Sequence, residues 1–273
     1  MKKKAGTRSH SQTRAASESR DLLYGVNPLL EALRAGERIP PEIVVAEGAR
    51  DERLHELIEL ARSKNVTVKR APRVSIDRAV GNARHQGVMA RIAAARYADT
   101  EDLLSSIASL VGGEKEPLVV LLDGVEDPRN LGAILRTSEC AGVDGVFVPE
   151  RRAAGLTDIV SKTAAGATEY LPVARATNLS RLIAQLKERN LWVVGTAADA
   201  SLNYTEWDWT RPSVVVLGGE GAGLHRLVRE RCDVLVRIPV QGKIQSLNVS
   251  VAAGIVLYEA LRQRSIAAPK LKQ

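Results

Sequence analysis

Residues 214–224 of this chain read Val-Val-Val-Leu-Gly-Gly-Glu-Gly-Ala-Gly-Leu. The apolar half has the length and composition of a buried strand, and the glycine-rich half follows it directly. Similar apolar runs recur along the second half of the chain, separated by stretches with helical spacing. We expect strands at 118–122, 144–148, 191–195, 213–217 and 234–238, and helices at about 128–141, 156–164, 178–189, 223–230 and 248–263. This alternation predicts an α/β domain built on a buried parallel sheet.

The glycine-rich loop differs from the common nucleotide-binding loops. It follows a late strand of the domain, and no acid lies about 20 residues further on a second strand, as a dinucleotide site requires. A phosphate-binding loop would continue with Lys and Ser or Thr, and Glu220 would repel phosphate. A loop that holds one carboxylate suits a cationic or hydroxyl-bearing ligand better. A plain glycine-rich entry into a helix is the alternative.

A second motif follows the first strand of this domain, where residues 122–136 read Leu-Asp-Gly-Val-Glu-Asp-Pro-Arg-Asn-Leu-Gly-Ala-Ile-Leu-Arg. Ligands of open α/β sheets bind at this carboxyl end. Asp127 can cap the helix, and Gly132 permits close approach of another backbone. Neither role requires Asn130 or Arg136, which lie about 120° apart around the helix. A simple strand–turn–helix corner with an exposed arginine is the alternative.

A third motif, residues 238–254, reads Ile-Pro-Val-Gln-Gly-Lys-Ile-Gln-Ser-Leu-Asn-Val-Ser-Val-Ala-Ala-Gly. The polar residues Ser246, Asn248 and Ser250 interrupt an otherwise apolar passage into a helix. Ser246 could serve only as a helix cap. The small residues 252–254 indicate close packing against another backbone.

The N-terminal half predicts a smaller α/β unit at 21–96 and a linker at 97–117, before the larger domain at 118–265. Tails of 1–20 and 266–273 flank these parts. Within the small unit we expect helices that begin at Pro28, capped by Asn27, and at 54–61 and 75–80, with strands at 42–46, 66–68 and 87–92. A further short helix is expected at 103–111 in the linker.

The net charge of +7 is unevenly distributed. Residues 1–20 hold six basic side chains and one acid, and their Ser/Arg/Lys composition predicts disorder. Such a tail is either a solvated terminus or a flexible arm that binds phosphates non-specifically. Residues 62–96 hold nine basic side chains against Asp77 alone. This stretch predicts contact with a polyanion, with a merely solvated face as the alternative.

Composition also argues against several classes of protein. The longest uncharged run, between Lys243 and Glu259, is too short and too polar to span a membrane. Cys140 and Cys232 lie in no zinc-binding spacing, and we expect two buried thiols in a cytoplasmic protein. The 3% of aromatic residues argues against base stacking as the main contact with RNA.

Taken in order, Asn130…Arg136, Gly218-Gly-Glu-Gly221 and Ser246-Leu-Asn248 resemble the SpoU branch of the SPOUT RNA methyltransferases, over about residues 21–265. The resemblance implies an α/β fold whose C-terminal segment forms a deep trefoil knot, a rare exception to unknotted topology. It also implies S-adenosyl-L-methionine as cofactor and no metal. The cofactor contacts carried over to this chain are Gly218, Ile238 and Leu247, with the neighbours Leu217 and Gly219.

The reaction implied is attack of a ribose 2′-hydroxyl on the sulfonium methyl group, in an obligate homodimer. The family gives the central role to the arginine that matches Arg136, sometimes as general base. Because a guanidinium has a pKa above about 12, we expect Arg136 instead to bind the target phosphate and orient the hydroxyl. The other predicted catalytic residues position Arg136 and the ribose: Asn130, Glu220, Ser246 and Asn248.

The N-terminal unit resembles the ribosomal-protein-like substrate-binding domain of the rRNA-modifying members, through Tyr24-Gly-Val-Asn-Pro28 and His85-Gln-Gly-Val88. This favours a guanosine of 23S rRNA as target. A tRNA methyltransferase and an antibiotic-resistance rRNA methyltransferase are alternatives. A catalytically silent RNA-binding protein on the same scaffold is an alternative of another class. A nucleotide-dependent oxidoreductase is opposed by the position of the glycine loop.

Overall fold

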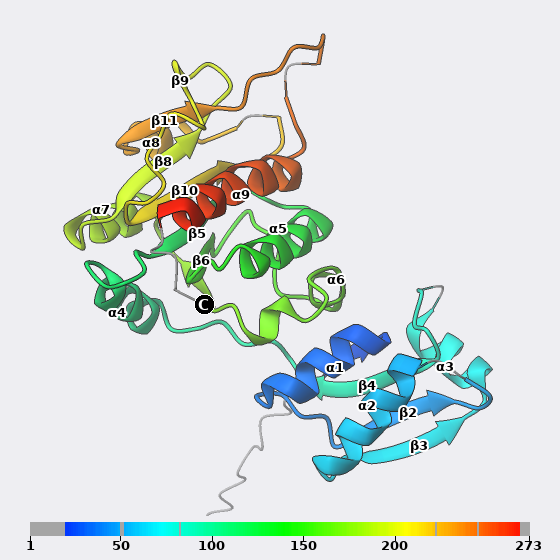
Figure 1. Cartoon of the computed structure of the whole chain (residues 1–273). Coiled ribbons are helices and arrows are strands. Elements are labelled where there is room, and N and C mark those ends of the chain that lie inside the picture. Colours follow the sequence, from blue (N-terminus) through cyan, green and yellow to red (C-terminus); the bar gives the residue numbers. More distant parts are fainter. Residues whose placement is uncertain (1–19, 50–51, 82, 222, 245, 268–273) are drawn as a thin grey trace, which may run out of the picture.

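The structure is a computed structural model that describes residues 20–49, 52–81, 83–221, 223–244 and 246–267. It contains a smaller N-terminal domain and a larger C-terminal domain (Figure 1). The expectations for residues 1–19 and 268–273 concern positions outside the described residues.

The N-terminal domain is a four-stranded sheet in the order β1-β4-β2-β3, in which β4 runs antiparallel to both neighbours and β3 runs parallel to β2. Helices α1 and α2 pack together beside it (Figure 1). Leu29 and Leu33 of α1, Leu57 of α2 and Ile43 of β2 are almost fully buried in the shared core. The elements are β1 (Arg20–Tyr24), α1 (Val26–Ala35), β2 (Glu42–Ala46), α2 (Glu52–Ser63), β3 (Thr67–Ala71), α3 (Arg73–Val80) and β4 (Val88–Ala93).

The expected start of α1 is wrong. The helix begins at Val26, after Gly25 at φ 98°, so Asn27 is already helical and caps nothing. The backbone N–H of Val26 donates instead to Gln86 Oε1 at 3.2 Å, and Asn27 accepts from Arg53 at 3.0 Å. A side chain from a distant loop has therefore taken the place of the local cap.

The C-terminal domain confirms the parallel sheet. Seven strands pair in the order β7-β6-β5-β10-β8-β11-β9, and every pairing between neighbours is parallel. Strands β7 and β9 were not expected from the sequence. The elements are α4 (Thr100–Leu110), β5 (Leu118–Asp123), α5 (Pro128–Cys140), β6 (Gly145–Pro149), α6 (Asp158–Thr163), the 3-10 turn η1 (Ala167–Glu169), β7 (Val173–Ala176), α7 (Leu179–Glu188), β8 (Trp192–Thr196), β9 (Leu202–Asn203), β10 (Ser213–Gly218), α8 (Arg226–Arg229), β11 (Val234–Arg237) and α9 (Val249–Ala267).

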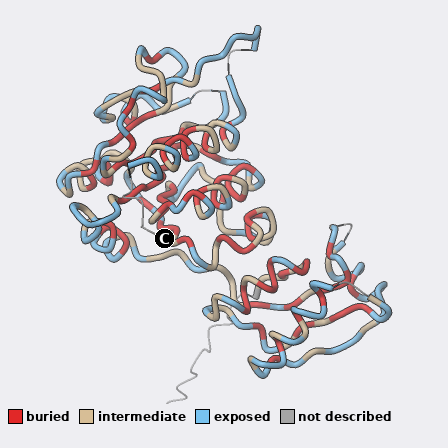
Figure 2. Tube along the Cα trace, viewed as in Figure 1, coloured by how far each residue is buried: buried red, intermediate tan, exposed pale blue. Residues whose placement is uncertain are grey.

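Both faces of the large sheet are covered, which explains why its strands are apolar at nearly every position. Val120 and Val215 face a cluster that includes residues of α5, α6 and α9. Val119 and Val214 face a second cluster that includes residues of α4 and α7. Burial is accordingly continuous along the central strands (Figure 2).

Two glycines of the 214–224 motif lie where no side chain fits. A β-carbon at Gly218 would overlap the backbone of Gly223 and Leu224, and one at Gly219 would overlap the backbone of Gly124. The loop after β5, which holds Gly124, and the glycine-rich loop therefore cross in direct backbone contact. The predicted trefoil knot concerns the path of these segments around one another and remains a prediction.

The close approach expected at Gly132 is also present, and it involves α6. A β-carbon on Gly132 would lie 2.5 Å from Thr163 Cβ and 3.0 Å from the carbonyl oxygen of Val160. At Gly254 the nearest atom to such a carbon is Thr137 Cγ2 at 3.9 Å, an ordinary contact. At Gly254 itself, therefore, no other backbone approaches closely, whereas its neighbour Ala253 is fully buried.

The two domains meet through α6, η1, α1 and β1. Arg38 is almost buried there, and its guanidinium binds Glu169 at 2.8 Å and the carbonyl oxygen of Ala93 at 2.8 and 2.5 Å. The N–H of Leu22 donates to Asp158 at 3.5 Å. Burial raises the pKa of Glu169, and burial together with the nearby Asp21 raises the pKa of Asp158. The contact between the domains is therefore polar and partly desolvated.

One expectation for the cysteines is wrong. Cys140 is exposed at the last turn of α5, and Cys232 is only partly buried. Both are free thiols. Among the helices of the described ranges, none is long and apolar enough to cross a membrane.

Candidate active site

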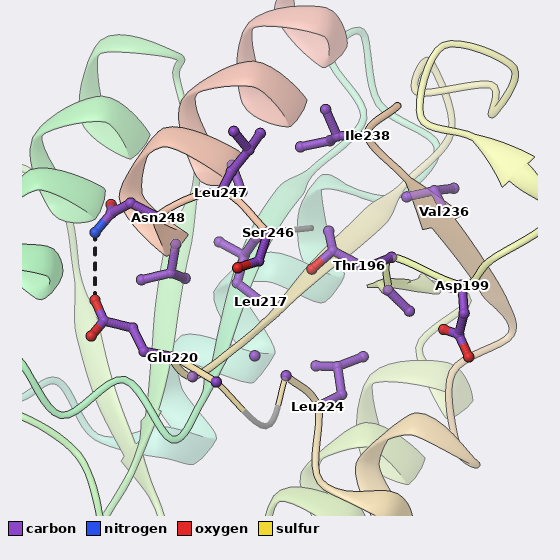
Figure 3. A pocket seen from close by; sticks show the side chains of 18 of the residues that line it. Thr196, Asp199, Leu217, Glu220, Leu224, Val236, Ile238, Ser246, Leu247 and Asn248 are labelled. Carbon is purple, nitrogen blue, oxygen red and sulfur yellow. Dashed lines mark hydrogen bonds between the residues drawn. The ribbon is translucent and has the colours of Figure 1, made fainter. Parts of the chain in front are cut away.

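The carboxyl ends of β5, β10 and β8 lie side by side because the three strands are parallel and adjacent. The segments that follow β8 and β10 line a cavity of about 740 Å³, together with the passage from β11 to α9 (Figure 3). This is the edge at which open α/β sheets bind their ligands. The cavity is lined by Thr196, Ala197, Ala198, Asp199, Leu217, Gly218, Gly219, Glu220, Gly221, Gly223, Leu224, Arg229, Val236, Ile238, Val240, Ser246, Leu247, Asn248, Val249 and Ala252.

All five residues expected to contact the cofactor line this one cavity: Leu217, Gly218, Gly219, Ile238 and Leu247. They come from two segments about 20 residues apart in the sequence. The leucine and isoleucine side chains form apolar walls, and the two glycines leave backbone groups open to the cavity (Figure 3). The arrangement suits a ligand held largely by backbone atoms.

One polar side chain from each of the three motifs meets at one end of the cavity. Asn130 Nδ2 donates to Glu220 Oε1. Asn248 Nδ2 donates to the same oxygen at 3.4 Å (Figure 3). Asn248 Nδ2 also lies 3.1 Å from Asn130 Oδ1. Asn130 is only 8% exposed, so its amide is removed from bulk water. We call Asn130, Glu220 and Asn248 the polar triad.

Asn248 is held in its orientation by the start of α9. Its Oδ1 accepts from the N–H of Ser250 at 2.9 Å and from the Ser250 hydroxyl at 2.6 Å. Since α9 begins at Val249, Asn248 and not Ser246 caps the helix. The cap occupies the oxygen and leaves the amide N–H groups of Asn248 directed at Glu220. Ser246 is left free to line the cavity.

Arg136 stands apart from the other predicted catalytic residues. It is exposed on α5 and lines a second cavity, of about 400 Å³, between the two domains, with Glu31 and Tyr170 among its neighbours there. Within the described part of the chain it makes no hydrogen bond or ion pair. The divergence of Asn130 and Arg136 around their helix, expected from their spacing, is thus realised.

The sequence did not indicate the third wall of the cavity. This wall consists of Thr196, the last residue of β8, and residues 197–199 after it; the Thr196 hydroxyl donates to the carbonyl oxygen of Val216 at 3.1 Å. Asp199 accepts two hydrogen bonds from Arg229, at 2.8 and 2.9 Å, which lower the pKa of the carboxylate. A usable signal existed, because a strand was expected at 191–195 and its carboxyl end had to reach the same edge.

The cavity combines an apolar middle with polar groups at two places. The polar triad supplies one carboxylate, and the Asp199–Arg229 pair supplies charges of both signs on the opposite side (Figure 3). Such a site fits an elongated ligand with cationic and hydroxyl groups. Over the described residues, no three or more His, Cys, Asp or Glu side chains are grouped so as to hold a metal ion.

Comparison with known proteins agrees with this division into two parts. Residues 117–258 match the SpoU rRNA Methylase family, and residues 22–98 match the family described as RNA 2′-O ribose methyltransferase substrate binding. The chain is 44% identical over 243 residues to the 23S rRNA (guanosine-2′-O-)-methyltransferase RlmB of Pseudomonas syringae, which covers 89% of this chain and 96% of that protein. It is also 43% identical over 246 residues to RlmB of Escherichia coli, and this match covers 90% of the present chain and 99% of RlmB.

A solved structure has the same fold over most of the chain. The AdoMet-bound rRNA methyltransferase from Sinorhizobium meliloti superposes with a TM-score of 0.71 at 25% identity, over 89% of this chain and 87% of that one. The family match covers the sheet, the glycine-rich loop and most of α9. Since residues 117–258 match the family model and relatives at 44% and 43% identity cover 89% and 90% of the chain, the chain belongs to the SpoU rRNA methylase family.

Proposed function

We propose that this protein transfers a methyl group from S-adenosyl-L-methionine to the ribose 2′-hydroxyl of a guanosine in 23S rRNA, in the cytoplasm. The observation that carries the proposal is the polar triad, which joins all three motifs by hydrogen bonds and places Glu220 and Asn248 in the lining of the cavity. The relatives that resemble the chain over both domains bear the name of this reaction.

The residues of the cavity fit the cofactor. Leu217, Ile238 and Leu247 would enclose its apolar and planar parts, and the backbone groups around Gly218 and Gly219 would bind its polar edges. The acidic Glu220 suits a ligand that carries positive charge. When bound, S-adenosyl-L-methionine supplies a methyl group that its sulfonium has already activated.

The residues of the chain then have to align the ribose and dispose of one proton. Asn130 and Asn248 hold the carboxylate of Glu220 in one place, which fixes the end of the cavity nearest α5. The Arg136 guanidinium would bind the target phosphate in bidentate fashion and so orient the hydroxyl. The phosphate, rather than the arginine, would assist in removing the hydroxyl proton, because the guanidinium stays charged.

The position of Arg136 supports the proposal of a second copy of the chain. Arg136 does not line the cofactor cavity of its own chain, yet α5 packs beside α9. Val251 and Tyr258 form an exposed apolar stripe on α9, with 49% and 51% of each residue exposed. We infer a homodimer in which this stripe is covered and Arg136 completes the partner's site.

The N-terminal domain would bind the rRNA. Basic side chains are exposed on β3, α3 and the following loop, among them Arg70, Arg73 and Arg84. Others are already paired, as Lys69 is with Glu42 at 2.5 Å. Phosphate contacts of this kind position an RNA without reading its bases. Selection of one guanosine would then follow from the RNA structure presented to the cavity.

The decisive experiment compares 23S rRNA from cells with and without this protein, by mapping 2′-O-methylated nucleotides. One guanosine should lose its methyl group in the absence of the protein and regain it when the gene is restored. Binding of S-adenosyl-L-methionine to the purified protein, followed by calorimetry, provides the second measurement. Unchanged methylation of every cellular RNA, with no cofactor binding, would leave only a catalytically silent RNA-binding protein.

A further inference from the structure

We propose that Asp123 is a positioning residue which clamps both ends of the glycine-rich loop and thereby sets the affinity for the cofactor. The loop comprises residues 219–221 and 223–225. The inference rests on the proposed function, because it names a determinant of the same cavity. Asp123 itself does not line the cavity, so it acts only through the loop.

The carboxylate holds the far end of the loop. It is only 4% exposed and accepts two hydrogen bonds from one residue: the backbone N–H of His225 at 2.7 Å and the imidazole Nδ1 of His225 at 2.9 Å. Each bond uses a different carboxylate oxygen. A buried carboxylate is tolerated only when such donors replace water, so these bonds are stronger than those between neutral groups.

The backbone of the same residue holds the near end. The carbonyl oxygen of Asp123 accepts from the N–H of Gly219 at 2.7 Å. Inside the loop, the N–H of Gly223 donates to the carbonyl oxygen of Gly219 at 3.3 Å. One residue at the end of β5 therefore fixes the first and last residues of a loop that begins about 100 residues later in the chain.

The surroundings leave the loop little alternative. Gly219 lies against the backbone of Gly124, and a β-carbon on Gly124 would lie 3.1 Å from the His225 ring. The loop carries Glu220 of the polar triad and Leu224 of the apolar wall. Release of the His225 end would thus displace both the carboxylate of Glu220 and the side chain of Leu224.

The test is Asp123→Asn, with cofactor affinity measured by calorimetry on the full-length protein. The amide keeps one acceptor oxygen but turns an NH₂ group toward one of the two donors of His225. We expect the Kd for S-adenosyl-L-methionine to rise roughly tenfold or more, the loss usual for a hydrogen bond to a charged group. The variant His225→Ala keeps the backbone bond and loses only the imidazole, so its Kd should rise by a few-fold.

The matched control is Asp144→Asn. Asp144 accepts from the N–H of Leu118 at 2.8 Å, at the opposite end of β5 and away from the cavity. This substitution should lower the melting temperature to a similar extent and leave the Kd unchanged. A merely structural role of Asp123 predicts equal Kd values for the two variants, and that result would overturn the inference.

Hydrogen exchange in the ligand-free protein separates this inference from the proposed function. The amides of residues 219–221 and 223–225 should exchange faster in Asp123→Asn than in the wild type, while Asp144→Asn leaves them unchanged. If the wild type bound no cofactor, the proposed function would fail and the exchange rates would still test the clamp. Equal exchange rates in the wild type and Asp123→Asn would overturn the proposed clamp. If Asp123→Asn did not fold, His225→Ala would be tested by the same two measurements.

Discussion

The side-chain amide of Asn248 lies 3.1 Å from the amide oxygen of Asn130, a residue 118 positions earlier in the chain. The contact joins the start of α9 to the first turn of α5, and Glu220 of the glycine-rich loop binds both amides. The two helices are therefore fixed relative to the loop by the neutral amide groups of Asn130 and Asn248, which both donate to the Glu220 carboxylate. The single carboxylate at their centre becomes the feature on which the site depends.

Replacement of Glu220 should consequently affect both motifs. In Glu220→Ala, the amides of Asn130 and Asn248 lose their shared acceptor, and methyl transfer should fall by about 10²-fold, a typical cost for one preorganised group in an active site. Glu220→Gln keeps one acceptor oxygen and should lose less. Single-turnover transfer of labelled methyl to 23S rRNA fragments measures both. Equal rates in wild type and Glu220→Ala would exclude a role for the triad in the reaction.

The dimer predicts that two inactive variants restore each other. When the Arg136→Ala and Glu220→Ala proteins are mixed in equal amounts, their chains exchange and form hybrid dimers. If Arg136 acts across the interface, one of the two active sites in each hybrid holds both wild-type residues. Activity should recover to roughly a quarter of the wild-type value, from random pairing in a symmetric dimer. The mixture stays inactive if Arg136 serves its own chain. Light scattering supplies the control, because Tyr258→Asp on the apolar stripe should yield monomers that show no such recovery.

Arg136→Lys tests the assigned chemistry of the arginine. Lysine keeps the charge but cannot form two parallel hydrogen bonds to a phosphate. Methyl transfer should fall by at least tenfold, with the Kd for the cofactor unchanged, because Arg136 is assigned to the target phosphate and does not line the cofactor cavity of its own chain. Near wild-type transfer by the lysine variant would contradict a bidentate role.

The sequence predicts the large sheet well because its central strands are continuous apolar runs. The sequence does not predict strand β7, because Arg175 interrupts its four residues. It does not predict β1 either, because that strand begins with the charged residues Arg20 and Asp21. The three motifs identify most of the cavity, but they do not indicate which polar atoms meet. That depends on crossings between segments about 100 residues apart, which no local pattern records. The cap at Asn27 failed for the same reason, since Gln86 arrives from another loop.

Gly219→Ala should abolish cofactor binding, because the added methyl group overlaps the backbone of Gly124 and must displace the loop. Gly242→Ala is the matched control: it lies in the third motif, and the nearest atom to its β-carbon is Ile244 N at 4.0 Å. Calorimetry with S-adenosyl-L-methionine should show no binding to the first variant and wild-type binding to the second. Binding by both would mean that the crossing is not tight in solution.

Arg38→Ala should weaken the contact between the domains. The substitution leaves the buried carboxylate of Glu169 without its cation and should cost about 3 kcal/mol. Arg34→Ala is the control, because Arg34 is half exposed in its pairs with Glu31 and Glu56 and should cost less than about 1 kcal/mol. Calorimetric unfolding measures both. Equal losses for the two variants would show that the Arg38 pair is no more than a surface ion pair.

Asp158 gives the domain contact a pH dependence of known sign. Burial, and then Asp21, raise the pKa of Asp158 above its value of 3.8 in the unfolded chain. Its protonated form therefore stabilises the fold fully below about pH 3.8, and this contribution is lost as the pH rises through the folded pKa. Asp158→Asn should be slightly more stable than wild type at pH 7, and the difference should vanish near pH 3.5. Urea unfolding across this range tests it.

Asp199→Asn should change the stability at pH 7 in the opposite direction to Asp158→Asn. Hydrogen bonds from Arg229 lower the pKa of Asp199, so its contribution to stability is present above the unfolded pKa and disappears as the pH falls through the folded one. This variant should be slightly less stable than wild type at pH 7. The same sign of change in both variants would contradict the assigned surroundings of Asp158.

The absence of a side chain at residue 132 has a consequence for how a target is chosen. Gly132 lets α5 rest directly on α6, and α6 in turn contacts β1 and places Lys162 4.2 Å from the ring of Tyr24. A continuous series of contacts therefore joins the substrate-binding domain to the helix that carries Asn130. We expect these contacts to hold that domain at a set distance from the cavity, so that a target nucleotide is selected by its distance from the bound RNA segment as well as by direct contact.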